Sequence, residues 1–120
     1  MKKYNYEIGR YGESLACKFL KEKNYKIIHN NFSTKLGEID IISLYDDTII
    51  FTEVKSRYNS KYGLPCESVN YRKQRNIIKI AKFYIYINKL YNYNIRFDVC
   101  EIYLNNSDED YKINYIENAF

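Results

Sequence analysis

The chain has 120 residues and a formal net charge of +4, and no apolar run in it approaches the ~20 residues that a membrane-spanning helix needs. Its charged start, MKKYNYEIGR, is not typical of a signal peptide, and a single histidine excludes a histidine-rich zinc cluster. Three cysteines without a CxxC pair predict reduced thiols in a cytoplasmic protein. We therefore expect one domain, residues 1–120, without membrane association.

Apolar spacing predicts a helix, three strands, a second helix and two further strands. The first helix spans 6–23 and the second about 67–90, each with apolar residues at three- and four-residue steps. Runs rich in β-branched and apolar residues predict the strands, which are 25–32, 38–45, 48–54, 95–104 and 111–116. Residues 56–65 are expected to form a loop. This order predicts an α/β fold in which helices flank a mixed sheet, because the second helix crosses over between strands.

The second and third predicted strands form a hairpin around Asp46-Asp47. If its loop has two or four residues, paired residues have numbers that sum to 93. Asp40 then faces Glu53 and Glu38 faces Lys55, all on one face of the sheet, with Cβ atoms ~5 Å apart. A three-residue loop would break this register.

Three carboxylates beside one lysine are costly on an otherwise apolar sheet, because burial and like charge both oppose ionisation. A hard divalent ion removes that cost, and Mg²⁺ often uses only one or two carboxylates with water and phosphate. The alternative is a solvent-facing hairpin end with a cross-strand Glu38–Lys55 ion pair, which contributes little by itself. Spacing alone leaves both interpretations open.

The net charge conceals an alternation along the chain. Residues 1–35 carry +5, residues 36–54 carry −5, residues 55–90 carry +8 and residues 91–120 carry −4. Basic segments on either side of an acidic one fit a metal site whose polyanionic ligand is held from both sides. The alternative is that the helices are simply lysine-rich on their solvated faces.

Two helices carry polar residues at or beside their apolar stripes. Gln74 lies three residues before Ile77, so it continues the inward stripe of the second helix, with Lys73 beside it. Glu13 lies at the border of the buried face of the first helix. Each could serve a site or be an ordinary boundary residue, whereas Asp98, within an apolar strand, is expected to be structural.

Five ordered blocks resemble the YraN-like family of predicted endonucleases. They are GRYGESLACKFL, NYKIIHNNFSTKLGEIDII, FTEVKSR, YGLPCESVNYRKQRNIIKIAKFYI and RFDV, and they extend over about residues 9–103. The family is similar to archaeal Holliday-junction resolvases and belongs by fold to the restriction-endonuclease-like PD-(D/E)XK nucleases. The resemblance therefore implies an αβββαβ core. Ile39 stands where the superfamily name has proline, and this leaves the neighbouring carboxylate in place.

The resemblance also implies a metal site. Asp40 and Glu53 would ligate Mg²⁺, for which Mn²⁺ could substitute. The carbonyl of Val54 would be a further ligand, and Glu13 would approach the same site from the first helix.

Further roles follow from the same resemblance. Lys55 would orient the attacking water or stabilise charge in the transition state, and Gln74 would assist in the site or contact the phosphate. Arg57 and Lys73 would contact DNA and offset developing charge.

We thus expect an Mg²⁺-dependent endonuclease acting on DNA, including branched DNA such as Holliday junctions, in repair or recombination. The alternative is a non-cleaving nucleic-acid-binding or adaptor protein that retains the nuclease fold, since a fold alone does not establish an activity. No groove-reading helix or stacking motif is evident, so phosphate and shape contacts should dominate over base readout. Homodimerisation is left open by the sequence.

Overall fold

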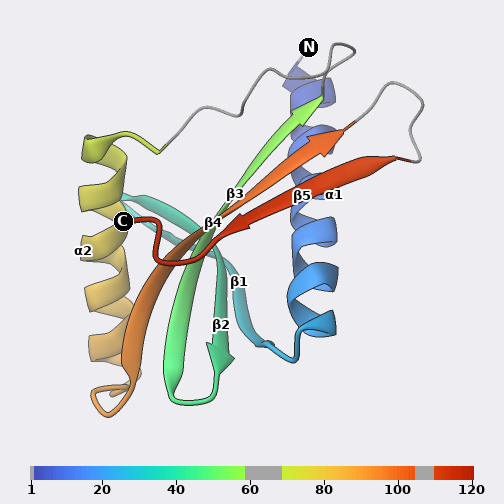
Figure 1. The fold of residues 1–120 in the computed structure, drawn as a ribbon. Coiled ribbons are helices and arrows are strands. Elements are labelled where there is room, and N and C mark those ends of the chain that lie inside the picture. Colours follow the sequence, from blue (N-terminus) through green and yellow to red (C-terminus); the bar gives the residue numbers. More distant parts are fainter. Residues whose placement is uncertain (1, 59–68, 105–109) are drawn as a thin grey trace.

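The computed structural model describes residues 2–58, 69–104 and 110–120 (Figure 1). Two helices and five strands follow one another in the predicted order. They are α1 (Lys2–Glu22), β1 (Lys26–Thr34), β2 (Gly37–Tyr45), β3 (Thr48–Tyr58), α2 (Tyr71–Ile87), β4 (Asn94–Leu104) and β5 (Tyr111–Ile116). The predicted α/β class is confirmed.

Two predicted boundaries differ from the structure in ways that affect the site. Residues 56–58 belong to β3 rather than to a loop, because β3 continues to pair with β4 as far as Tyr58 and Leu104. Helix α2 begins at Tyr71, after its N-cap Asn70, rather than near residue 67. The rest of the expected loop, including residue 61, lies outside the described residues.

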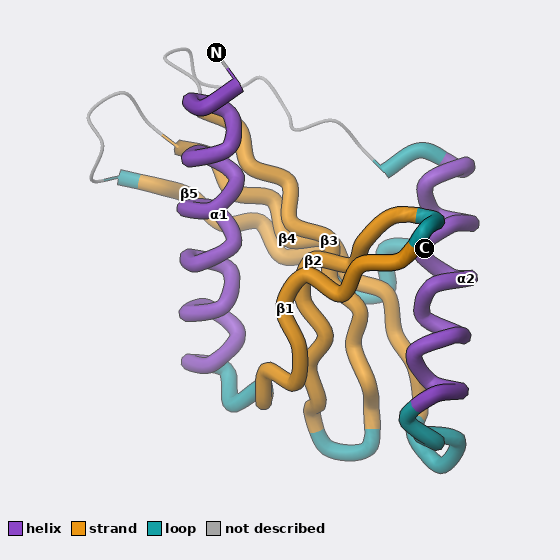
Figure 2. The backbone as a smooth tube through the Cα atoms, turned by 180° about the vertical axis from the view of Figure 1, so that it is seen from behind, coloured by secondary structure: helices purple, strands orange, loops and turns teal. Residues whose placement is uncertain are grey.

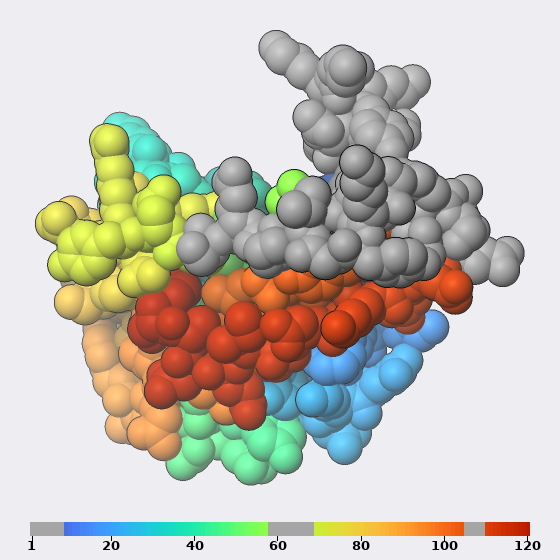
Figure 3. Space-filling model, turned by 45° about the horizontal axis from the view of Figure 1, so that its top comes forward, coloured from blue at the N-terminus to red at the C-terminus, as the bar shows by residue number. Residues whose placement is uncertain are grey.

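The five strands form one mixed sheet in the order β1-β2-β3-β4-β5. Strands β3 and β4 are parallel and are joined through α2, whereas the other three pairings are antiparallel. The helices α1 and α2 cover opposite faces of the sheet (Figures 1 and 2). In the space-filling view, β5 and the C-terminal residues (red) lie between α2 (yellow) and α1 (blue) (Figure 3). This is the arrangement expected for a restriction-endonuclease-like core.

Each face of the sheet has its own apolar core. On the α2 side, apolar residues of β2 and β3 pack against the helix, and the buried residues include Ile39, Ile42, Phe51, Ile77, Ile80 and Tyr84. On the α1 side the buried residues include Leu15, Ala16, Leu20, Ile41, Ile50 and Ile102. Burial of both stripes fixes the two helices on the sheet, since each fully buried aliphatic side chain contributes ~1.5–3 kcal/mol.

The β2–β3 hairpin has the predicted register over its first five pairs. It closes over the two-residue turn Asp46-Asp47, and the pairs run from Tyr45–Thr48 to Ile41–Thr52. Asp46 has φ 51°, a left-handed conformation that aspartate tolerates better than most residues. The ladder ends at Ile41–Thr52, immediately before Asp40 and Glu53.

The pleat of β2 is interrupted at this same point. Ile39 and Ile42 both belong to the core on the α2 side, although residues three apart on a regular strand face opposite ways. Asn31 of β1 lies beside the interruption, between the pairs Asn30–Ile41 and Phe32–Ile39, and has φ 55°. Left-handed backbone at a non-glycine residue often marks a functional site.

Candidate active site

Asp40 and Glu53 interlock across the fork where β2 and β3 stop pairing. The backbone N–H of Val54 donates to Asp40 Oδ2 at 2.8 Å, and the backbone N–H of Asp40 donates to Glu53 Oε2 at 3.3 Å. Each carboxylate thus accepts an N–H from the opposite strand in place of a ladder carbonyl. Glu53 is 2% exposed, so the pair lies at the buried end of the fork.

The expected backbone pairs Asp40–Glu53 and Glu38–Lys55 are absent from the β2–β3 pairing. The carboxylates of Asp40 and Glu53 accept backbone N–H groups that would otherwise donate to carbonyls of the opposite strand. Glu38 instead accepts a hydrogen bond from Ser33 Oγ of β1 at 3.1 Å. The prediction that Glu38 pairs with Lys55 across the hairpin is therefore wrong, because the pairing of β2 and β3 ends before these residues. The predicted proximity of Asp40 and Glu53 is correct.

Two lysines approach the carboxylates from different elements. Lys73 of α2 places Nζ 3.5 Å from Glu53 Oε1. Lys55 lies on β3 two residues after Glu53, so both side chains point to the same face, and it is hydrogen-bonded to Lys73. Two carboxylates and two lysine amines therefore meet at one end of the sheet, and the contact between the amines requires that one of them, Lys55, accept a hydrogen bond as a neutral amine.

Burial is the main cause of the altered acidity of both carboxyl groups. It raises the pKa of Glu53, helped by the negative charge of Asp40, and the result is about 7 despite the opposing effect of Lys73. Burial also raises the pKa of Asp40, against the hydrogen bond from Val54. Both carboxyl groups are therefore harder to ionise here than in water, and a cation bound beside them would favour their charged forms.

The two lysines titrate in opposite directions. Burial, then the contact with Lys73, lowers the pKa of Lys55. Burial also acts to lower the pKa of Lys73, but the hydrogen bond with Lys55 and the charges of Glu53 and Asp40 outweigh it and raise the value. Lys55 is thus the amine that gives up its proton more readily, and Lys73 is the persistent cation.

The start of α2 sets the position of Lys73. Asn70 is the N-cap, and its side chain accepts the backbone N–H of Lys73 at 2.9 Å. Gln74 donates its side-chain amide to the carbonyl of Val69 at 2.8 Å, which holds the chain entering the helix. Gln74 therefore supports the helix start, and its expected contact with a phosphate stays a prediction.

Glu13 reaches the site region from α1. Its pKa is raised by burial and then by Asp40, while a hydrogen bond from Asn31 opposes the shift. Asn31 thus connects α1 to the strand position beside Asp40, and the sequence analysis missed it. The Asn30-Asn31 pair within a strand was the available signal, because asparagine is enriched at left-handed positions.

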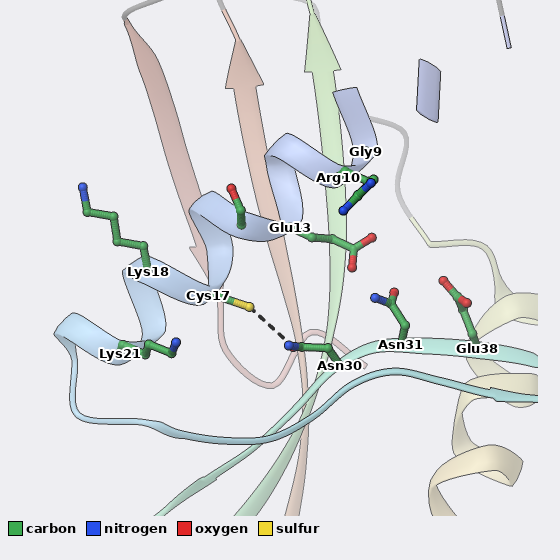
Figure 4. Close-up of a pocket in the computed structure, with 10 residues that line it drawn as sticks. Gly9, Arg10, Glu13, Cys17, Lys18, Lys21, Asn30, Asn31 and Glu38 are labelled. Atoms are coloured by element: carbon green, nitrogen blue, oxygen red, sulfur yellow. Dashed lines mark hydrogen bonds between the residues drawn. The ribbon is translucent and has the colours of Figure 1, made fainter. Parts of the chain in front are cut away.

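Two grooves flank the carboxylates, and Glu38 lines both. One, of about 1020 Å³, lies between α1 and the strands β1 and β2 and is lined by Arg10, Glu13 and Asn31 among others (Figure 4). The other, of about 210 Å³, lies between the start of β2 and α2 and is lined by Asn70, Arg72 and Lys73. Glu13 connects the larger groove to Asp40, and Lys73 connects the smaller one to Glu53, although neither carboxylate of the pair lines a groove itself.

The donor set suits a hard divalent cation with few protein ligands. Asp40 and Glu53 offer carboxylate oxygens on adjacent strands, and Mg²⁺ often takes one or two carboxylates together with water and phosphate. Within the described parts of the chain, no three His, Cys, Asp or Glu side chains converge as a metal-binding group. Glu13 thus adds negative charge near the pair, and ligation by Glu13 or by the Val54 carbonyl stays a prediction.

The remaining residues singled out from the sequence lie on the neighbouring strand pair. Arg57 lies on β3, where it pairs with Tyr103 of β4. Asp98 is fully buried and accepts hydrogen bonds from Arg96, Tyr115 and the backbone of Asn118. Asp98 thus anchors the C-terminal segment to β4, as its structural assignment predicted.

The fold and the site define a class: an open mixed α/β sheet with a helix on each face and a buried carboxylate pair where two central strands separate. The chain belongs to the uncharacterised protein family UPF0102, whose model matches residues 12–102. This membership confirms the YraN-like resemblance of the five sequence blocks.

Relatives match over the whole chain. A UPF0102 protein of Clostridium botulinum (strain Alaska E43 / Type E3) is 56% identical over 120 residues, which are 100% of this chain and 98% of that protein. One from Clostridium novyi (strain NT) is 53% identical over 100% of both chains. One from Clostridium acetobutylicum is 50% identical over 100% of this chain and 98% of its own length. Their names state no activity. In the described part of the chain, no helix has the length and apolarity to cross a membrane.

Proposed function

We propose that this protein is a cytoplasmic, Mg²⁺-dependent endonuclease that hydrolyses phosphodiester bonds in DNA, with branched DNA among its substrates. The observation that carries the proposal is the interlocked pair Asp40 and Glu53, buried at a fork of the sheet beside two lysines. Burial raises the pKa of both carboxyl groups, and the negative charge of Asp40 raises the pKa of Glu53 further, so a bound cation would relieve a cost that the metal-free site carries.

The chain's own residues suit the steps of phosphodiester hydrolysis. A bound Mg²⁺ ion would supply Lewis-acid stabilisation of phosphate charge and a more acidic water. Asp40 and Glu53 would hold the ion, and each carboxylate is oriented by a backbone N–H from the other strand. Lys55, with its lowered pKa, is placed to orient the attacking water or to carry a proton.

Lys73 is placed for a second electrostatic role. In the metal-free site its ammonium group neutralises Glu53 at 3.5 Å. If Glu53 held a divalent ion, Lys73 would be available to face the phosphate charge, together with Arg72 on the wall of the smaller groove. Preorganised positive charge of this kind stabilises the transition state of a phosphoryl transfer.

The test is metal-dependent cleavage of linear, flapped and four-way DNA by the wild type and by Glu53→Gln. Cleavage with Mg²⁺ or Mn²⁺ that is lost with a chelator and in the variant supports the proposal. A wild type that cuts none of these substrates with either ion contradicts it. DNA binding without cleavage would favour the alternative, a binding or adaptor protein on the nuclease fold.

A further inference from the structure

The larger groove continues away from the carboxylate pair along one face of α1. Its helical wall is formed by residues at three- and four-residue steps, which therefore share that face: Arg10, Glu13, Ser14, Cys17, Lys18 and Lys21. The opposite wall is formed by Asn30 and Asn31 of β1 and by Glu38 of β2 (Figure 4). The groove therefore has a helix on one side and polar strand residues on the other.

Charge changes sign along this groove. Glu13 lies close enough to Asp40 and Glu38 for their charges to raise its pKa, so one end is acidic and adjoins the carboxylate pair. Farther along, Cys17 lies between Glu13 and Lys21, and both charges act on its thiol. Lys18 and Lys21 make the far end basic, and both are exposed. A polyanion that enters at the acidic end would need a bound cation there and would find ammonium groups beyond it.

The lining favours a phosphate backbone over bases. Among the residues whose side chains the structure describes, none that lines this groove is aromatic, so they offer no platform on which a base could stack. Apart from the carboxylates of Glu13 and Glu38 and the thiol of Cys17, its polar side chains are ammonium, guanidinium, amide and hydroxyl groups, which are the usual phosphate donors. From Arg10 to Lys21 the helix rises about 16 Å at ~1.5 Å per residue, which matches about five nucleotides of one B-DNA strand at ~3.4 Å each.

We infer that this groove carries the phosphate backbone of the DNA strand as it leaves the carboxylate pair, with Lys18 and Lys21 pairing to phosphates a few nucleotides from the bond that is cut. The inference rests on the proposed function, since it assigns a strand path to the same site. Because Lys18 and Lys21 would contact DNA phosphates and not bases, their contribution to binding should not depend on the DNA sequence.

The first test compares two double variants with equal charge loss. Lys18→Ala/Lys21→Ala removes the basic end of the groove, and Lys79→Ala/Lys82→Ala removes two exposed lysines of α2 that line neither groove. DNA binding is measured across a salt series with a fixed low concentration of Ca²⁺ in place of Mg²⁺, so that a cation is available at the acidic end, and the DNA is checked to be intact after each measurement. Each lost phosphate contact should lower the slope of log affinity against log salt by ~0.9 on duplex or ~0.7 on single-stranded DNA.

The groove variant should therefore lose a slope of ~1.4–1.8, and the α2 variant should change little. Equal slopes for the two variants, or a wild type that binds no DNA, overturn the strand path. If Lys18→Ala/Lys21→Ala keeps the wild-type salt slope on DNA but loses binding to polyglutamate, the strand path is also overturned, and the groove is assigned to an acidic polypeptide. If the wild type binds but does not cut, the proposed hydrolysis fails, and the strand path is still decided by the slope.

A thiol footprint gives a second measurement that does not depend on charge. Ser14 is exposed and lines the groove, so Ser14→Cys, in a chain with Cys17→Ser and Cys66→Ser, places a reactive thiol on the strand path. Saturating DNA should slow its alkylation by at least severalfold, whereas Lys79→Cys in the same background should react at an unchanged rate. Equal protection of both thiols, or of neither, contradicts the inference.

Discussion

Lys73 Nζ lies 3.5 Å from Glu53 Oε1, and this contact joins an exposed helix side chain to a carboxylate that is 2% exposed. The lysine itself is 45% exposed. Glu53 also lies close enough to Asp40 for their like charges to raise its pKa, so the lysine offsets only part of the charge at the fork. If Glu53 binds a divalent cation, as proposed, that cation would compete with Lys73 for the carboxylate.

This competition predicts how a Lys73 variant responds to metal. Lys73→Ala should lower the free energy of unfolding at neutral pH by about 1–2 kcal/mol without metal, since a buried carboxylate loses its partner. The loss stays below that of a fully buried pair because Lys73 is partly exposed and Glu53 can take up a proton. Mg²⁺ should then stabilise the variant more than the wild type, as measured by thermal unfolding across a metal titration.

Lys79→Ala serves as the control, because Lys79 is exposed on the same helix and lines neither groove. It should leave both the stability and the metal response unchanged. An Mg²⁺ response in Lys73→Ala smaller than that of the wild type would contradict the competition between the ion and the lysine.

The raised pKa of Glu53 predicts a pH dependence of stability. The value rises from 4.5 to about 7, chiefly through burial, so the folded protein keeps a proton that the unfolded chain has released. The free energy of unfolding of the metal-free protein should therefore fall as the pH rises from about 4.5 to about 7, by up to about 3 kcal/mol. Glu53→Gln should flatten this decline in chemical unfolding followed at several pH values. A decline of unchanged size in the variant would assign it to other groups.

The close approach of α1 to β3 at Gly12 predicts that a larger residue there destabilises the protein. A Cβ atom at Gly12 would lie 1.7 Å from Ser56 Oγ and 2.8 Å from Ser56 Cβ, so the helix would have to move. Gly12→Ala should cost about 1–3 kcal/mol and displace the adjacent Glu13 from the site. Ser56→Gly in the same chain should restore part of the loss, as measured by thermal unfolding.

Gly9→Ala is the matched control, because a Cβ atom there would have no neighbour within 4 Å. It should raise stability by up to about 1 kcal/mol, since alanine favours a helix more than glycine does. Comparable losses at Gly9 and Gly12 would indicate a backbone effect rather than the close contact with Ser56.

The hydrogen bonds of Asp98 predict a large loss of stability that is separate from the site. Arg96 Nε and Nη2 donate to its two oxygens at 2.9 and 2.8 Å, and the backbone N–H of Asn118 donates at 2.9 Å. Asp98→Ala should cost about 2–4 kcal/mol, because several donors lose a buried acceptor, although Arg96 keeps its contacts with Glu117 and Tyr25. The stabilisation by Mg²⁺ should be kept in the folded variant. Its disappearance would mean that the C-terminal anchor also organises the fork.

The sequence predicted the hairpin register because a two-residue turn and the period of a strand determine every pair between them. The sequence could not predict where the pairing of β2 and β3 ends. That point depends on whether the backbone N–H groups of Asp40 and Val54 donate to carbonyls of the opposite strand or, as observed, to the carboxylates of Glu53 and Asp40. Only the tertiary packing of α2 brings Lys73 to Glu53, so its position next to Gln74 in the sequence gave no sign of the contact. The left-handed backbone of Asn31 had one weak signal, the Asn30-Asn31 pair, within a run that otherwise resembles an ordinary strand.

The division of labour between the two lysines gives the last prediction. Lys55 has a lowered pKa and lies on the strand that carries Glu53, whereas Lys73 has a raised pKa and pairs with that carboxylate. Lys55→Ala should therefore keep DNA affinity within a few-fold and lose cleavage by ~10²–10³, since a group that acts mainly in the transition state changes the rate rather than the affinity. Single-turnover cleavage and chelator-blocked binding separate these two quantities. Lys55→Arg keeps the positive charge but cannot release its proton, so rescue by arginine would assign the residue to charge stabilisation, and failure of rescue to proton transfer. Normal cleavage by Lys55→Ala would remove this lysine from the mechanism altogether.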